Sequence, residues 1–231
     1  MNIIVISPKA SEDSAKSLAK ELGCEYDNPY KSGRNDYTAY DVIINYGYSQ
    51  LFKMNRNVTL INSPGSVAAC INKLKTLTLL AIHNIPVPDF GSKVKAEWGI
   101  AICHTKMEGR KNEGIEHWYR QDGQPIPPAY LYTNYYAHRG EYRVVVLNGK
   151  VVGRYRKVVD DEGMWSLEVR DKRGFEDMDS ACLRAARALG VKYAGFDVLA
   201  KRKDAFVIIE ANSGPILTEE SVEAFKEFLG V

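Results

Sequence analysis

The chain has 231 residues, of which 45% are hydrophobic and 26% charged, and its formal net charge is +2. This composition is typical of a soluble globular protein with one large domain or a few small lobes. No apolar run approaches the length of a membrane span, and the N-terminal MNIIVISPKASED lacks the pattern of a secretory signal. The four cysteines form no CxxC pair, so we expect free thiols in a cytoplasmic protein.

Residues 1–65 alternate short apolar runs with polar, helix-like segments. NIIVIS, DVIINYG and NVTLINS have the composition of strands. SEDSAKSLAKELG has helical spacing, and its last residue, Gly23, lies just past the expected end of the helix. Strands that are separated by helix-length segments indicate a small parallel α/β lobe. The lobe contains no GxGxxG motif, so we predict no dinucleotide site there.

Residues 66–136 differ in character. GSVAACINKLKTLTLLAIHN has the spacing of one amphipathic helix, and the following IPVPDF must be extended because proline restricts the residue before it. The strand GIAICHT leads to Lys106 and to a loop bounded by Gly109 and Gly114. Glycines let a backbone approach an anion, so this loop is either a phosphate site or an ordinary hairpin loop. The tyrosine-rich PAYLYTNYY is either strand core or the wall of a pocket for a planar base.

The segment EYRVVVLNGKVVGRYRKVV predicts a hairpin around its Asn-Gly dipeptide. Alternation places Glu141 and Arg143 on one face of the first arm. In the second arm Arg154 and Arg156 share a face, with Lys157 opposite. Cations are frequent between residues 139 and 173, which indicates a solvated strand face, a polyphosphate site or a nucleic-acid surface.

The segment GFDVLAKRKDAFVIIEANSGP places oxygen-bearing side chains inside two apolar strands. If Lys203 and Asp204 form the turn, Asp197 lies directly opposite Glu210, and Asn212 projects on the same face. Like charges that face each other destabilise a sheet, whereas two carboxylates and a carboxamide suit Mg²⁺. The alternative is a solvated sheet edge in another register. The histidines and cysteines match no zinc spacing.

Four segments, in this order, resemble the ATP-grasp superfamily and, within it, the RimK-type amino-acid ligases and their compact relatives. They are NKLKTLTLLAIHNIPVPDF, EYRVVVLNGKVVGRYRK, AARALGVKYAGFDVL and VIIEANSGP. The resemblance implies an α/β (α+β) ATP-grasp fold with three parts. These are an N-terminal parallel α/β lobe (1–65), a central lobe with a phosphate loop (66–136) and a C-terminal lobe with a metal site (137–231). The last two lobes would clamp ATP.

The resemblance also implies which residues bind the nucleotide and the metal. Asp197, Glu210 and Asn212 would hold two Mg²⁺ ions, for which Mn²⁺ can substitute. Lys73 and Lys106 would contact the phosphates, under a loop from Met107 to Gly114 that includes Gly109. The adenine would meet the hinge formed by Tyr132, Thr133, Asn134, Tyr135 and Tyr136.

The catalytic cations implied by the resemblance are Arg143, Arg156, Lys157 and Arg170. Arg143, with either Arg156 or Lys157, would neutralise the γ-phosphoryl group and the acyl phosphate formed from it. Arg170 takes the place of the arginine in an Arg-Asn pair, although Asp171 follows it here.

The function implied is an ATP-dependent carboxylate–amine ligase that forms an amide or peptide bond through an acyl phosphate. Its substrates would be small-molecule or peptide carboxylates and amines. The resemblance implies no membrane partner, allows nucleic acid only as a modified substrate, and is compatible with a homodimer. Two alternatives stay open: a nucleic-acid-binding protein that uses the basic, tyrosine-rich region 130–173, and a nucleotide-binding pseudoenzyme.

Overall fold

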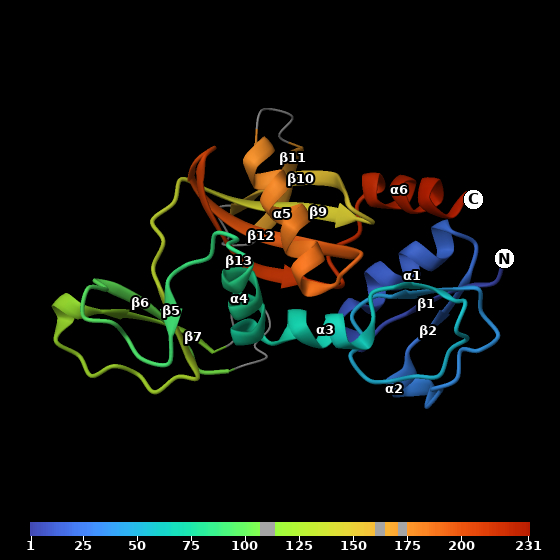
Figure 1. The fold of residues 1–231 in the computed structure, drawn as a ribbon, viewed down its shortest axis with the longest axis horizontal. Coiled ribbons are helices and arrows are strands. Elements are labelled where there is room, and N and C mark those ends of the chain that lie inside the picture. The colour runs from blue at the N-terminus through green and yellow to red at the C-terminus, as the bar shows by residue number, and fades with distance from the viewer. Residues whose placement is uncertain (107–113, 160–164, 171–174) are drawn as a thin grey trace.

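The computed structural model describes residues 1–106, 114–159, 165–170 and 175–231. These residues form three separate sheets, two of them flanked by helices (Figure 1). The N-terminal and central sheets lie at opposite ends of the molecule, and the C-terminal sheet lies beside the helices that connect them (Figure 1). The predicted lobe boundaries at residues 65 and 136 stay predictions.

The N-terminal sheet is parallel, with the strand order β2-β1-β3-β4. Both central strands consist of buried residues, mostly Ile and Val, as expected for parallel strands covered on both faces. The elements are β1 (Ile3–Ile6), η1 (Lys9–Ser11), α1 (Glu12–Glu21), β2 (Glu25–Asp27), α2 (Pro29–Ser32), β3 (Val42–Asn45) and β4 (Thr59–Ile61). The predicted parallel α/β lobe is confirmed.

The single helix predicted after Pro64 is wrong, because the segment forms two helices, α3 (Pro64–Ile71) and α4 (Lys73–Ile82), bent by 101°. Asn72 breaks the helix: its backbone is extended, and its side chain accepts a hydrogen bond from the Lys75 N–H, 2.9 Å away, which caps α4. Among the described residues no single helix is long and apolar enough to cross a membrane; only this bent pair passes, by length and composition alone.

The central sheet is antiparallel, in the order β5-β8-β6-β7. A small core that includes Trp98, Cys103 and Trp118 packs against it. Its elements are β5 (Phe90–Gly91), β6 (Ile100–His104), β7 (Ile115–Tyr119), η2 (Arg120–Asp122) and β8 (Leu131–Asn134).

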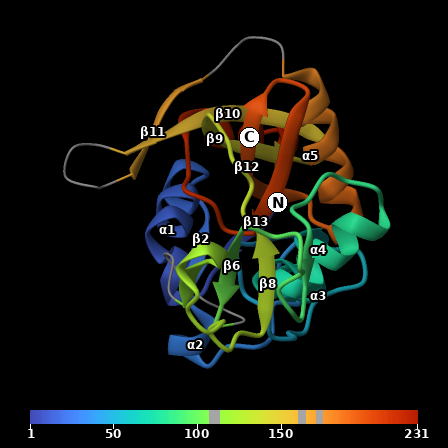
Figure 2. The same cartoon turned by 90° about the vertical axis from the view of Figure 1, so that its left-hand side faces the viewer.

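The C-terminal sheet is antiparallel, in the order β11-β10-β9-β12-β13 (Figure 2). The predicted hairpin turns at Asn148-Gly149, where both residues have positive φ angles, 46° and 79°. Helix α5 packs on one face of the sheet, and α6 packs with the N-terminal lobe on the other. The elements are β9 (Gly140–Leu147), β10 (Lys150–Val159), β11 (Trp165–Arg170), α5 (Glu176–Leu189), β12 (Tyr193–Arg202), β13 (Ala205–Asn212) and α6 (Glu219–Leu229).

Asn62 ties the N-terminal lobe to the C-terminal sheet. It is buried and has a φ angle of 62°. Its Oδ1 accepts hydrogen bonds from the N–H groups of Lys192 and Tyr193, at 2.9 and 3.1 Å. Its Nδ2 donates to the carbonyl oxygens of Tyr193, at 2.7 Å, and Ser213, at 3.3 Å. One side chain therefore fixes the start of β12 and the chain just after β13.

We predict that Asn62→Ala lowers the free energy of unfolding by about 3 kcal/mol, because it leaves buried backbone groups without partners and places alanine at a positive φ angle. Asn148→Ala is the matched control, since it imposes the same backbone strain at an exposed turn. Urea denaturation of both variants measures the difference. If both variants lose the same free energy of unfolding, the hydrogen bonds of Asn62 do not hold the lobes together.

Candidate active site

The predicted turn of the β12–β13 hairpin and its Asp197–Glu210 pair are confirmed, although the register shifts twice between them. The strands turn at Lys203-Asp204, and Asp197 lies directly opposite Glu210. Asn212 lies opposite Gly195 on the same face as Glu210. The structure thus brings the three predicted metal ligands together on one side of the sheet.

Asp197 lies on β12, an interior strand of the sheet, and is only 4% exposed. Its partner in the neighbouring strand β9 is Arg143, which lies directly opposite. Arg143 grips both carboxylate oxygens, with Nε 2.6 Å from Oδ1 and Nη2 2.8 Å from Oδ2. Burial alone would raise the pKa of Asp197, but the charges and hydrogen bonds of Arg143 and Lys157 outweigh it and hold that pKa below its ordinary value. Asp197 is therefore ionised at neutral pH.

Of the two cations predicted as alternatives, Lys157 is the one that reaches Asp197. Its Nζ lies 2.7 Å from Asp197 Oδ2 and 2.6 Å from Glu141 Oε1. Arg156 is exposed and lies opposite Tyr142, whose ring packs on Phe175 at the α5 side of the sheet. The structure therefore does not bring Arg156 to the carboxylates.

Lys73 begins α4 and lies beside the β12–β13 hairpin, with Nζ 4.0 Å from Glu210 Oε2. Lys73 and Lys106 line one pocket, together with Leu74, His104, Tyr130 and Leu131. Both predicted phosphate lysines are thus brought to the same place. The predicted phosphate loop lies outside the described residues from Met107 to Glu113, Gly109 included.

Gly114, the last residue of that loop, has a φ angle of 71°. A Cβ atom there would lie 2.8 Å from the side chain of Lys106. Both the backbone conformation and the space beside Lys106 therefore require glycine. Arg170 pairs through its backbone with Tyr155, but its side chain and Asp171 lie outside the described part of the chain.

His104 is buried and lines the pocket that contains Lys73 and Lys106. From sequence alone, we consider the histidines only as zinc ligands. The Nε2 of His104 lies 3.3 Å from Thr133 Oγ1. Burial, and then the charge of Lys73, lower its pKa from 6.5 to about 4. The imidazole is therefore neutral at physiological pH, next to two cationic lysines.

The predicted hinge, residues 132–136, comprises most of β8 and the two residues after it. Tyr132 is core: its hydroxyl donates to the Pro127 carbonyl oxygen, 2.7 Å away. Asn134 and Tyr135 donate their backbone N–H groups to the carbonyl oxygens of Asp89 and Ile100, at 2.7 and 3.1 Å. Tyr136 packs under Lys201, whose Nζ lies 4.7 Å from the ring centre. The backbone here is held in place by the central sheet.

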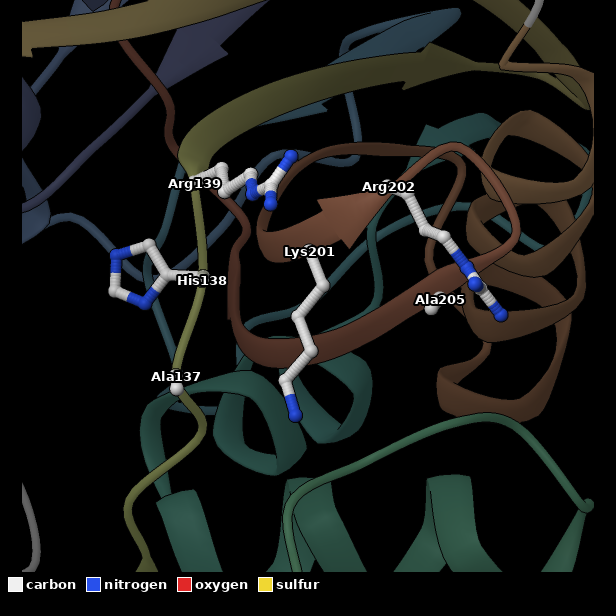
Figure 3. Close-up of a pocket in the computed structure, with 6 residues that line it drawn as sticks. All are labelled: Ala137, His138, Arg139, Lys201, Arg202 and Ala205. Atoms are coloured by element: carbon white, nitrogen blue, oxygen red, sulfur yellow. The ribbon is translucent and has the colours of Figure 1, made fainter.

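A hollow of about 660 Å³ opens next to the hinge, between residues 137–139 and the tip of the β12–β13 hairpin. Its lining includes His138, Arg139, Lys201 and Arg202. Figure 3 shows these side chains pointing in different directions, so the hollow does not gather their charges at one point. No predicted site residue within the described ranges is among its lining residues.

The donor set fits magnesium by its chemistry. Asp197, Glu210 and Asn212 offer hard oxygen ligands on one face of the hairpin, and the Glu210 side chain is 45% exposed. Among the described residues no group of three or more His, Cys, Asp or Glu side chains could hold a metal ion. The predicted set consists instead of two carboxylates and a carboxamide, and a magnesium ion there would take its remaining ligands from phosphate and water.

No family model matches the chain. Among curated proteins, human N-acetylaspartylglutamate synthase A is 28% identical over 184 residues, which are 67% of this chain and 46% of that protein. Beta-citrylglutamate synthase B from Danio rerio is 24% identical over 179 residues, 67% of this chain and 44% of that protein. The chain spans about half the length of the curated relatives it matches.

Solved structures align with the whole length of the chain. The ATP-grasp ligase PsnB, complexed with a minimal precursor, aligns with a TM-score of 0.72 at 14% identity, covering 100% of this chain and 99% of that one. The chain has the ATP-grasp fold. D-alanine–D-alanine ligase from Bacillus anthracis, complexed with ATP, aligns at a TM-score of 0.66 and 13% identity, covering 100% and 93%. The ATP-grasp fold predicted from sequence is confirmed. Another structure of PsnB holds a minimal precursor, Mg and ADP.

We predict that the stability of this ATP-grasp chain falls as the pH drops from about 6.5 to about 4. In that window the unfolded chain protonates His104 while the folded chain keeps it neutral. The His104 contribution is a loss of about 3 kcal/mol across the window. His104→Gln should remove this part of the pH dependence, whereas the same change at exposed His83 should not. Identical pH profiles of urea denaturation for wild type and His104→Gln would contradict the assignment.

Proposed function

We propose that the chain is an ATP-dependent ligase that joins a carboxylate to an amine. The observation that carries the proposal is the convergence at one sheet face of Asp197, Glu210 and Asn212, with cations from three other elements around them. The ATP-grasp fold, and relatives that are named as synthases and ligases, support it.

ATP and Mg²⁺ are the proposed cofactors. Asp197, Glu210 and Asn212 would hold the metal, and Lys73 and Lys106 would bind phosphate oxygens from the pocket that they share. Bound magnesium would neutralise charge on the phosphates during transfer. Arg143 is fixed by the sheet, so it presents a cation in an unchanging position next to the metal ligands.

The chemistry needs no protein nucleophile. A carboxylate oxygen of the substrate attacks the γ-phosphorus of ATP, the bond to the β-phosphate oxygen breaks, and ADP leaves. The resulting acyl phosphate has a good leaving group. The amine nitrogen then attacks the acyl carbon, phosphate leaves, and the amine loses a proton as the amide forms. Positioning and cationic side chains supply most of the catalysis in such transfers, which matches the lysines and Arg143 of this site.

We propose small-molecule or peptide substrates. The names of the two curated relatives describe synthases of glutamate conjugates, and PsnB has been solved with a precursor peptide. Glutamate and short peptides are therefore the first amines and carboxylates to test for ATP-dependent phosphate release.

Glu210→Gln tests the proposal, because Glu210 is half-exposed and its charge can be removed without burying an unpaired group. Asp197 is less suitable, since its loss would leave Arg143 buried without its anion. We expect the variant to lose Mg²⁺-dependent binding of a non-hydrolysable ATP analogue by at least tenfold, as expected for loss of a metal ligand. Calorimetric titration with and without Mg²⁺ measures this.

Glu227→Gln, at an exposed surface pair, is the matched control and should bind like wild type. If wild type does not bind the analogue but binds DNA or RNA, with an affinity that falls steeply as the salt concentration rises, the nucleic-acid alternative replaces the ligase proposal. A wild type that binds the analogue but releases no phosphate with any acid and amine would favour the pseudoenzyme.

A further inference from the structure

Lys157 lies between two carboxylates on different strands. Its Nζ is 2.6 Å from Glu141 Oε1 and 2.7 Å from Asp197 Oδ2. Glu141 is its direct partner across the β9–β10 ladder, whereas Asp197 lies on β12, beyond β9. The lysine side chain therefore spans β9 to reach the predicted metal ligand (strand order in Figure 2).

The two cations on Asp197 are held differently. Arg143 lies directly opposite in the ladder and binds both oxygens with the rigid fork of its guanidinium. Lys157 contributes one bond, to an oxygen that Arg143 already contacts, from the end of a flexible stem. Release of Lys157 from Asp197 would break one hydrogen bond, whereas release of Arg143 would break two.

Magnesium at Asp197 would compete with Lys157. The ion binds oxygen at about 2.1 Å and requires nearly octahedral geometry. An ammonium group already within hydrogen-bond distance of the same carboxylate would be repelled by the dication, most strongly in a buried site. Glu141 offers Lys157 a second anion that it already contacts, and this glutamate is more open to solvent, with its side chain 34% exposed.

We infer that Lys157 occupies Asp197 until magnesium arrives, and that Glu141 then holds the displaced lysine beside the metal. Glu141 is thus a positioning residue for Lys157. The inference rests on the proposed function, because it requires a metal at Asp197. It differs from a purely structural ion pair in one respect: removal of Lys157 should strengthen metal binding.

The experiment measures the affinity for ADP, which is not turned over, by calorimetry at a series of free Mg²⁺ concentrations. Lys157→Met should lower the Mg²⁺ concentration at which the increase in ADP affinity is half-maximal. We expect a change of about tenfold, which corresponds to the free energy of one charge-assisted hydrogen bond. Glu141→Gln should raise this Mg²⁺ concentration, because the variant loses the anion that holds the displaced lysine away from Asp197. The double variant should behave like Lys157→Met, since Glu141 acts through the lysine.

Lys150→Met and Glu227→Gln, which remove the two charges of an exposed pair at another place on the surface, are matched controls and should leave the Mg²⁺ requirement unchanged. If Lys157→Met does not fold, Lys157→Gln takes its place, and thermal unfolding checks both. If ADP binding by the lysine variant depends on Mg²⁺ but requires as much Mg²⁺ as wild type, or more, this inference is overturned. The ligase proposal then stays intact. The inference is also overturned if Glu141→Gln has the same effect with and without Lys157. No Mg²⁺-dependent ADP binding by wild type would remove the ligase proposal, and this inference with it.

Discussion

The ion pair between Asp197 and Arg143 is the constraint around which the C-terminal sheet is organised. A carboxylate that is 4% exposed in the middle of a sheet would be too costly to keep ionised without a partner. The antiparallel pairing of β9 with β12 places Arg143 directly opposite, with two short hydrogen bonds. Because β12 lies between β9 and β13, Asp197 has Arg143 as its neighbour on one side and Glu210 on the other. Arg143 compensates the charge of Asp197, and Glu210 adds a second carboxylate beside it.

The N-terminal lobe supports the chain that follows the β12–β13 hairpin. Asn62 binds the Ser213 carbonyl oxygen, and the Tyr46 hydroxyl donates to the Pro215 carbonyl oxygen. Gly214 lies so close to Tyr46 that a Cβ atom would be 2.8 Å from the Tyr46 carbonyl oxygen. The N-terminal sheet and the C-terminal sheet also share one hydrophobic core. The end of β13, which carries Asn212, is thus buttressed by a lobe that contributes none of the predicted metal ligands.

Sequence patterns predicted well where one local rule decides the structure. The Asn-Gly turn predicts the β9–β10 hairpin. The spacing around Lys203-Asp204 predicts the pairing of Asp197 with Glu210, although two register shifts that compensate each other lie between the turn and this pair. Apolar periodicity failed at Asn72, because a continuous helical face runs across both α3 and α4 while a side-chain cap breaks the backbone between them. Periodicity reports which residues are buried, and it is insensitive to a cap that ends one helix and starts the next.

The partners of the site residues were beyond local rules. Alternation placed Glu141 and Arg143 on one face, but it did not show that Lys157 crosses β9 to Asp197. His104 gave no signal as a pocket residue, because its position beside Lys73 depends on how α4 packs against the central sheet. Both contacts join residues far apart in the chain, and only the assembled sheets bring them together.

The choice of lysine at position 157 has a physical consequence of its own. An arginine there would present a second planar fork to carboxylates that Arg143 already binds, and a forked pair gives up two bonds when it parts. Lysine offers a compact charge with three donors, so it can keep its bond to Glu141 while it releases Asp197. In the arrangement that we infer, a fixed arginine and a movable lysine on one carboxylate would have separate tasks: Arg143 stabilises the buried charge, and Lys157 would leave the carboxylate to a metal.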